Sequence, residues 1–349
     1  MPPGMPPREL PCPPSLPVFP LLGNSRVPNL VGQPISSGSD EPPVDSFHQT
    51  TQSKHPPQSC FMTKLSTTSQ HRHCPLLDRP GPTRVLDVAP TPWEVRECLR
   101  TGFVYLANPP AQARFTDEFA WEVTHAEESS RRRREEPLLY AASRAAKLIR
   151  QRWLKRDKLV GILADIVCRQ SHGPIRLVDI GCADGDLFRR LVVRLPSEVM
   201  ERLEPIGIEI STQLAARANR RLGMYHGFCL HASGIEGLRT LPRDYVGLVI
   251  LSCVLEHELD PVPLLAACRE RLAPDGFIVV KVPNYACLGR QLRGRRWCGY
   301  RWPDHVNYFT PRSLAATAER AGLRVARMDL QDRSPLSDSL YAVLAQISH

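Results

Sequence analysis

The stretch that most constrains the fold runs from residue 177 to residue 186, with the sequence LVDIGCADGD. It begins with apolar residues typical of a buried strand and then changes to Gly181, Gly185 and small or acidic residues. The residues that follow, 187–193, carry apolar side chains at helical spacing. A strand, a tight glycine-rich turn and a helix form the first unit of a nucleotide-binding α/β domain. The sequence therefore predicts that such a domain begins here.

Two carboxylates accompany this turn. Asp179 stands just before it, and Glu209 ends the next apolar run, residues 205–210. An acidic residue at the end of the second strand can accept hydrogen bonds from both ribose hydroxyls of a nucleotide. A dinucleotide enzyme would have a third glycine and would place a pyrophosphate at the helix N-terminus. Here Asp184 and Asp186 put negative charge at that point, so the turn disfavours a nicotinamide dehydrogenase and favours a cationic cofactor without phosphate.

Strand and helix patterns alternate from residue 176 to the end of the chain. This order predicts a doubly wound, mostly parallel sheet with helices on both faces. The expected strands are 176–180, 205–210, 227–231, 246–251, 276–282, 323–330 and 339–346, and the expected helices are 185–195, 211–222, 262–272 and 311–321. Ligands of such sheets bind outside the carboxyl ends of the strands. The residues that follow each strand are therefore the candidates for chemistry.

Polar residues follow the fourth and fifth of these strands. After the fourth strand, the segment 251–261 reads LSCVLEHELDP, in which His257 is suited to accept a proton near pH 7 and Glu256 precedes it. An orienting or helix-capping role for both is the alternative. After the fifth strand, the block 297–311 reads WCGYRWPDHVNYFTP and ends in a helix start. In it Asp304, His305 and Tyr308 are candidate ligand-binding residues; the alternative is a purely structural corner formed by Trp302, Pro303 and Phe309.

Four motifs together resemble one family. They are the LVDIGCADGD turn, the VLEH segment at 254–257, the VPN segment at 282–284 and the pattern W-x-G-x-x-x-P-x-H-x-x-x-F-T-x-x-S-L that begins at Trp297. In this order and spacing they resemble the class I S-adenosylmethionine-dependent methyltransferases, in particular the group that includes ubiquinone O-methyltransferases. One departure is Ala183, which stands where the middle glycine of the family usually lies.

This resemblance implies a Rossmann-like seven-stranded sheet with helices on both faces and S-adenosylmethionine as the cofactor. It assigns cofactor contacts to the residues after the first four strands, which are Asp179, Gly181, Cys182, Ala183, Gly185, Glu209, Ile210, Gly234, Ile235 and Cys253. It directs Glu256 and His257 towards the site of methyl transfer, with Asp304 and His305 beside the acceptor. These four residues are the candidate catalytic set.

The N-terminal part of the chain has a different character. Residues 1–61 hold nearly half of the 34 prolines and are interpreted as a disordered tail, with translation from Met62 as a hypothesis. Residues 62–112 resemble a degenerate zinc ribbon, in which Cys74 and Cys98 remain but the second cysteine of each knuckle is Leu77 or Thr101. Two thiolates do not complete a tetrahedral zinc site, so no metal is expected. Residues 113–170 are predicted to form a helical cap, and residues 171–349 the methyltransferase domain.

Composition indicates the cellular environment in which we expect the protein. The 11 cysteines show no regular framework, and no apolar run approaches 18 residues, so we expect reduced thiols, no membrane span and a cytoplasmic location. The expected function is methyl transfer to an oxygen of a small-molecule or glycan-linked acceptor. A nucleic-acid methyltransferase is the second interpretation, and a non-catalytic protein that binds S-adenosylmethionine or a partner is the third. The second is suggested by the net charge of +9 and by arginines near the acceptor block, namely Arg290, Arg293, Arg295, Arg296 and Arg301.

Overall fold

The structure is a computed structural model of the chain. It describes residues 71–110, 157–170 and 172–347, together with single helical positions between 130 and 145. The predicted tail at 1–61, and the predicted cap as far as residue 156 apart from those positions, lie outside the described residues. No helix in the described part is both long enough and apolar enough to cross a membrane.

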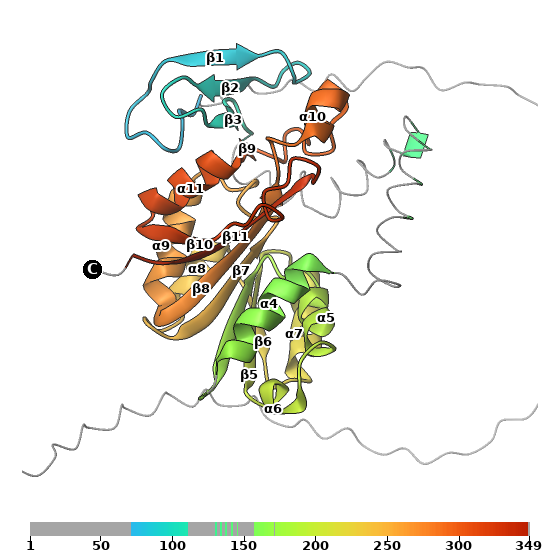
Figure 1. The fold of residues 1–349 in the computed structure, drawn as a ribbon, viewed down its shortest axis with the longest axis vertical. Coiled ribbons are helices and arrows are strands. Elements are labelled where there is room, and N and C mark those ends of the chain that lie inside the picture. The colour runs from blue at the N-terminus through green and yellow to red at the C-terminus, as the bar shows by residue number, and fades with distance from the viewer. Residues whose placement is uncertain are drawn as a thin grey trace, which may run out of the picture. The chain divides into compact units, whose positions relative to one another are not determined.

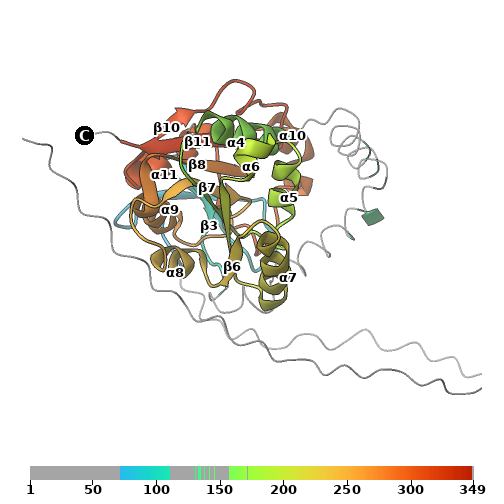
Figure 2. The ribbon, with the colours of Figure 1, turned by 90° about the horizontal axis from the view of Figure 1, so that it is seen from below.

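A seven-stranded sheet forms the centre of the fold (Figures 1 and 2). Its strands lie in the order β10-β11-β8-β7-β4-β5-β6. Strands β4 to β8 are parallel to one another, whereas β11 pairs antiparallel with both β8 and β10. The bounds are β4 (Ile175–Ile180), β5 (Leu203–Glu209), β6 (Phe228–His231), β7 (Val246–Ser252), β8 (Leu272–Pro283), β10 (Leu323–Arg327) and β11 (Ser339–Gln346).

The order of the strands defines where a ligand binds. From β4 the chain proceeds outward through β5 to β6, and it then returns to form β7 on the other side of β4. Ligands of open α/β sheets lie outside the carboxyl ends of the strands at such a reversal. The turn after β4 and the loop after β7 are therefore neighbours at the predicted binding position.

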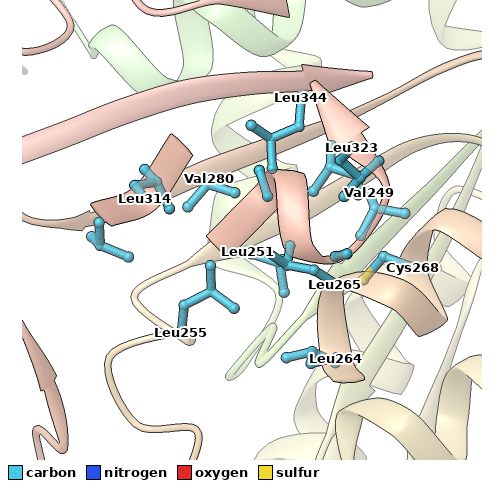
Figure 3. Close-up of a cluster of buried hydrophobic side chains, with 14 of the residues drawn as sticks. Val249, Leu251, Leu255, Leu264, Leu265, Cys268, Val280, Leu314, Leu323 and Leu344 are labelled. Carbon is cyan, nitrogen blue, oxygen red and sulfur yellow. The ribbon is translucent and has the colours of Figure 1, made fainter. Parts of the chain in front are cut away.

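Helices cover both faces of the sheet. Leucines of α4 (Lys158–Arg169), α5 (Asp186–Val192) and α7 (Thr212–Gly223) pack with Leu177 and Ile250 on one face. Leucines of α8 (Gly234–Arg239), α9 (Pro261–Arg271) and α11 (Pro311–Arg320) pack with Val178 and Val249 on the other. Figure 3 shows this second core, in which side chains from β7, β8 and β11 meet those of α9 and α11. Adjacent residues of one strand serve opposite faces because side chains alternate along a strand.

A second, smaller sheet is antiparallel and has the order β1-β2-β3-β9. Strands β1 (Thr83–Leu86), β2 (Val95–Cys98) and β3 (Val104–Leu106) come from the segment that resembles a zinc ribbon. Strand β9 (Asn307–Tyr308) comes from the block before α11. Apolar residues of β2 and β3 pack against Tyr285, Trp297 and Tyr308. A common core therefore joins this sheet to the block 297–311, which is called the acceptor block below.

Most predicted elements are present, with differences that have local causes. The predicted strand 323–330 ends at Arg327, because Asp332 accepts hydrogen bonds from the Asp329 backbone and from Arg327 and closes a turn there. Helix α8 was not predicted; a reciprocal cap between Ser233 and Glu236 starts it, and it is too short to show a helical period. The short elements α6 (Ser197–Met200), α10 (Leu288–Arg293) and the 3-10 turn Gly294–Arg296 were also not predicted.

Candidate active site

The turn after β4 has an unusual backbone. Gly181, Ala183 and Gly185 all have positive φ, at 66°, 50° and 77°. Glycine adopts this region without a steric penalty, whereas alanine does not. At position 181 space is also limited, because an added Cβ would lie 3.0 Å from Cγ2 of Val254 in the loop after β7. The glycine therefore lets the two loops approach closely, and Ala183 is held in a strained conformation.

Glu209 holds this turn in place. Its Oε2 accepts a hydrogen bond from the backbone of Ala183 at 2.9 Å, and its Oε1 accepts one from the backbone of Ser211 at 2.9 Å. Asp179, at the end of the adjacent strand β4, is buried like Glu209. Burial and the charge of Glu209 raise the pKa of Asp179 to about 7. Two buried carboxylates that repel one another suit a ligand that carries positive charge and donates hydrogen bonds, as the sulfonium, ammonium and ribose groups of S-adenosylmethionine do.

The other predicted cofactor residues lie at the same edge of the sheet, after β4, β5, β6 and β7. Cys182 is buried, with its Sγ 3.7 Å from Sγ of Cys229, whereas the side chain of Ile210 is half exposed. Gly234 begins α8, and a Cβ there would lie 3.0 Å from Cγ2 of Ile180. Cys253 has a φ of 62°, and Ile235 packs on the core. Their contacts with a cofactor stay predictions.

The four candidate catalytic residues converge from two segments. The Nδ1 atom of His257 lies 2.8 Å from Oδ1 of Asp304 and 3.0 Å from its backbone oxygen. The Nδ1 atom of His305 lies 2.9 Å from the backbone oxygen of Gly299. The two imidazole rings are perpendicular, with centroids 4.7 Å apart. One donor atom from each of Glu256, His257 and His305 lies within 4.8 Å of the others.

Hydrogen bonding fixes which imidazole nitrogens carry lone pairs. The partners of both Nδ1 atoms are carboxylate or carbonyl oxygens, which only accept, so each Nδ1 donates a proton. In the neutral form, each Nε2 is then the nitrogen with the lone pair. The Nε2 of His257 is buried without a hydrogen-bond partner in the described part of the chain, and neither oxygen of Glu256 bonds to another described residue.

The cluster is electrostatically coupled. Burial raises the pKa of Glu256, opposed first by the charge of His257 and more weakly by that of Lys281. Burial lowers the pKa of His257, but the charge and hydrogen bond of Asp304 outweigh it, so the net shift is upward. Burial and His257 lower the pKa of His305 to about 3, so this imidazole stays neutral. The charged form is thus favoured for His257, whereas His305 stays neutral.

A set of contacts that sequence analysis missed braces the loop after β7. The backbone oxygen of Glu256 accepts a hydrogen bond from Val306 at 2.7 Å. The Asn307 amide donates to the backbone oxygens of Leu255 at 2.9 Å and Glu258 at 2.6 Å. Arg72 donates to Oδ1 of Asn307. Asn307 stands inside the block already singled out and could have been included, whereas no motif marks Arg72.

The remaining predicted acceptor residue, Tyr308, lies in β9. Its ring packs against Tyr285 and Tyr300, and burial raises the pKa of its hydroxyl well above the usual value. Its hydroxyl is buried without a partner among the described residues. Trp302, offered as part of a structural corner, stacks on Tyr300 with ring centroids 4.9 Å apart. The aromatic corner and the polar cluster are both present and lie next to one another in sequence.

Three of the five arginines near the acceptor block have partners within the protein. Arg290 donates to the backbone oxygen of Tyr285 and lies over its ring. Arg295 pairs with Asp87, and Arg301 pairs with Asp304 at 2.6 Å. These contacts account for part of the basic character that suggested a nucleic-acid acceptor.

The segment that resembles a zinc ribbon offers two buried thiols. The Sγ of Cys74 lies 3.4 Å from Oγ1 of Thr101, and Cys98 is a hydrogen-bonding neighbour of both. Thr101 thus occupies the position at which the second cysteine of a knuckle was expected. In the described ranges, the group of three side chains that could hold a metal ion is instead Glu256, His257 and His305.

Comparisons with known proteins identify a family that the chain resembles. A family model described as "Methyltransferase domain" matches residues 140–327. Curated relatives include ubiquinone biosynthesis O-methyltransferases from Cupriavidus pinatubonensis (27% identical over 177 residues, 46% of this chain and 65% of the relative) and Cereibacter sphaeroides (31% over 164 residues, 43% and 60%). A trans-aconitate 2-methyltransferase from Methylobacterium nodulans is 29% identical over 122 residues, which are 35% of this chain and 43% of that protein. The chain thus spans less than two thirds of the length of each of these relatives.

Solved structures give weaker similarities. An O-methyltransferase from neocarzinostatin biosynthesis, in complex with S-adenosylmethionine and 2-hydroxy-5-methyl naphthoic acid, is 22% identical with a TM-score of 0.36, and the match covers 49% of each chain. A methyltransferase from Archaeoglobus fulgidus, described as SAM-dependent, is 21% identical with a TM-score of 0.40, and the match covers 58% of this chain and 99% of that one.

The family model covers more than half of the chain, from before α4 to the end of β10. This range includes the turn after β4, both carboxylates beside it and the cluster of Glu256, His257 and His305. The chain therefore belongs to the methyltransferase-domain family, and its seven-stranded sheet with helices on both faces has the fold expected for that family.

Proposed function

We propose that the protein transfers a methyl group from S-adenosylmethionine to an oxygen of a small-molecule or glycan-linked acceptor. One observation carries this proposal. The turn that suits the cofactor and the cluster of Glu256, His257 and His305 lie side by side, because Val254 contacts the turn and Glu256 follows two residues later. A donor site and a polar acceptor site at one edge of the sheet are what such a transfer requires.

The cofactor side is served by the two carboxylates and the glycine turn. When bound, S-adenosylmethionine supplies a methyl group already activated on a sulfonium sulfur. Glu209 is positioned to accept hydrogen bonds from the ribose hydroxyls while it keeps the turn closed through Ala183 and Ser211. The charge of Asp179 then favours the positively charged part of the ligand. The protein's task is mainly to hold the two reactants together, and such positioning can supply roughly 7–11 kcal/mol of the barrier.

The acceptor side is served by the polar cluster. An acceptor hydroxyl that lies against Glu256 and the neutral form of His257 meets lone pairs on both, and its proton passes to one of these two groups. Asp304 keeps Nδ1 of His257 as the donor and thereby keeps the lone pair of Nε2 directed to the acceptor. An acceptor oxygen is favoured over an apolar carbon because the buried polar groups would otherwise stay unpaired.

The class of acceptor is supported by the relatives. Those with 27–31% identity are named for ubiquinone biosynthesis, and one with 29% identity is named for trans-aconitate. Both names refer to small molecules. A nucleic-acid acceptor remains the second interpretation and rests on Arg293 and on Arg296, which is exposed. Because phosphate contacts weaken steeply with salt, a salt-dependent shift of RNA or DNA would identify that case.

Calorimetric titration of the full chain with S-adenosylhomocysteine tests the cofactor assignment, with NAD as the control. We expect micromolar binding of the first and none of the second. The same preparation is then screened for methyl transfer to compounds with hydroxyl, carboxyl or amine groups. We expect turnover with oxygen acceptors and loss of kcat in His257→Ala with unchanged affinity for S-adenosylhomocysteine. Turnover confined to amines or nucleic acids would overturn the proposal, and absence of cofactor binding would favour a role as a partner-binding protein.

A further inference from the structure

Glu256, His257 and His305 share a feature that hydroxyl binding alone does not explain. They come from the loop after β7 and from the segment before β9, yet one donor atom of each lies within 4.8 Å of the others. Glu256 is 1% exposed and His305 4% exposed. The carboxylate of Glu256 has no partner on another described residue, and Nε2 of His257 has none in the described part either. Two buried side chains and the partly exposed His257, whose Nε2 atom is itself buried, therefore lie together with lone pairs available in the neutral form of the imidazoles.

With His257 in its neutral form, this arrangement is unfavourable unless something positive lies between the groups. An unpaired buried carboxylate carries a large desolvation cost, and lone pairs directed at one another repel. The protein nevertheless enforces the arrangement, since the Glu256 backbone is tied to Val306 and both imidazoles are tied through Nδ1. A cation at the centre of the three donors would remove the conflict.

We propose that Glu256, His257 and His305 bind one divalent transition-metal ion at the acceptor side of the site. This inference rests on the proposed function and specifies how the cluster receives the acceptor. Two imidazoles and one carboxylate form a donor set that suits zinc, cobalt, iron or manganese. Donors bound to one zinc ion at about 2.1 Å are about 3.5 Å apart in a tetrahedron, so binding draws the three side chains slightly together.

The surroundings of the two imidazoles match those of metal ligands. A metal-binding histidine usually donates its other N–H to a carboxylate or a backbone carbonyl, which fixes the orientation of the ring. His257 donates to the carboxylate of Asp304, which Arg301 also holds, and His305 donates to the carbonyl of Gly299. The residue Asp304 thus becomes a positioning residue for a ligand rather than a group that touches the acceptor.

Three protein ligands leave at least one coordination position open. An acceptor hydroxyl that takes this position would have its pKa lowered by the ion. Because Glu256 and His257 would then be metal ligands, water would replace them as the group that takes the proton, while the oxygen keeps the electron pair. The acceptor expected from this site is therefore a compound whose hydroxyl oxygen can coordinate a metal ion. Amines that are protonated at neutral pH lack the lone pair needed for the same position.

Cobalt titration of the full chain tests the site directly. The protein is treated with a chelator, freed of it, and titrated with Co²⁺ while d–d absorption is followed in the visible range. We expect one ion per chain at micromolar concentration or tighter. Glu256→Gln and His305→Ala should each weaken binding at least about 100-fold, and Asp304→Asn about 10- to 100-fold. His172→Ala is the matched control, because His172 is exposed and precedes the amino end of β4, at the opposite edge of the sheet.

Two further measurements make the result decisive. The spectrum should lack intense thiolate charge-transfer bands, and Cys74→Ser should leave it unchanged; binding through the buried thiols instead would overturn the inference.

Affinity for S-adenosylhomocysteine is measured on each preparation. Cofactor binding and methyl transfer by a chain that takes up no Co²⁺ would overturn the metal site while the proposed function stands. Co²⁺ binding that depends on Glu256 and His305, without any affinity for S-adenosylhomocysteine, would support the metal site and overturn the proposed function.

Discussion

Asp304 holds His257 through both its carboxylate and its backbone oxygen, at 2.8 Å and 3.0 Å from the same Nδ1 atom. The two residues are 47 positions apart in the chain. This contact joins the loop after β7 to the block before β9, and it decides which nitrogen of His257 faces the rest of the cluster.

Asp304→Asn should impair the acceptor side and spare the cofactor side. The amide oxygen can still accept from Nδ1, but the charge that stabilises His257 and pairs with Arg301 is lost. We expect kcat to fall by about 10- to 100-fold, the size of effect known for residues that position a functional histidine. Affinity for S-adenosylhomocysteine, measured by calorimetry, should stay within about twofold. A parallel loss of that affinity would mean that Asp304 supports the whole site and not His257 in particular.

Glu209→Ala should weaken cofactor binding, in contrast to Asp304→Asn. The substitution removes the acceptor of two backbone hydrogen bonds that close the turn, and hydrogen bonds to a charged group contribute about 1.5–3 kcal/mol each. We expect affinity for S-adenosylhomocysteine to fall by at least about tenfold. Glu198→Ala, in α6, is the control and should bind normally. Normal binding by the Glu209 variant would show that the cofactor lies elsewhere.

Ala183→Gly should stabilise the protein. Ala183 has a φ of 50°, where a Cβ costs roughly 1–2 kcal/mol and where glycine is unstrained, although glycine also loses more entropy on folding. We expect a net gain of up to about 1 kcal/mol in the free energy of unfolding, measured with urea. Gly181→Ala is the matched opposite: it combines a φ of 66° with an approach of 3.0 Å to Val254 and should destabilise. Equal effects of the two substitutions would contradict the strain assigned to Ala183.

Asp179 should make the stability of the ligand-free protein depend on pH. Its pKa is raised from 3.8 in the reference state to about 7 in the folded state, so the folded chain binds a proton more tightly than the unfolded chain does. The free energy of unfolding should therefore fall as pH rises from about 4 to about 7 and then stay level. This difference between the two pKa values of Asp179 corresponds to a loss of about 4 kcal/mol in the free energy of unfolding.

The comparison with Asp179→Asn isolates this contribution from other groups that titrate in the same range. The variant cannot ionise, so it should gain stability over the wild type between pH 4 and pH 7 and keep that gain at pH 8. The free energy of unfolding of both proteins is measured with urea at several pH values. A constant difference between them across this range would exclude Asp179 as the titrating group.

The sequence predicted the large sheet well because its strands are short, continuous apolar runs, whereas its helices have apolar residues at helical spacing. Leu177 and Val178 illustrate the reason: both are apolar because a parallel strand is buried on both faces. The turn at Gly181 was predictable because few residues adopt its backbone. The candidate catalytic residues were singled out by motif, and the structure shows that they lie together; their roles remain predictions.

Other contacts could not be predicted from one sequence. Asn307 and Arg72 brace the loop after β7 through hydrogen bonds between positions 235 residues apart, and no local pattern records such a pairing. The grouping of His305 with Glu256 likewise depends on how two loops meet in space. A metal site was not expected, because the sequence directed attention to Cys74 and Cys98 rather than to these three residues.

The small sheet has a consequence for biosynthesis. Its first three strands are complete once residue 106 is made, but its fourth strand is residues 307–308. The emerging chain must therefore carry an unfinished sheet edge, with Val104 and Leu106 uncovered, until residues 307 and 308 have also left the ribosome. Domains usually fold from the N-terminus onward during synthesis, but here the small sheet is completed only after strands β4 to β8 of the large sheet have been made. Truncation before residue 307 would leave that edge open to pairing with other chains.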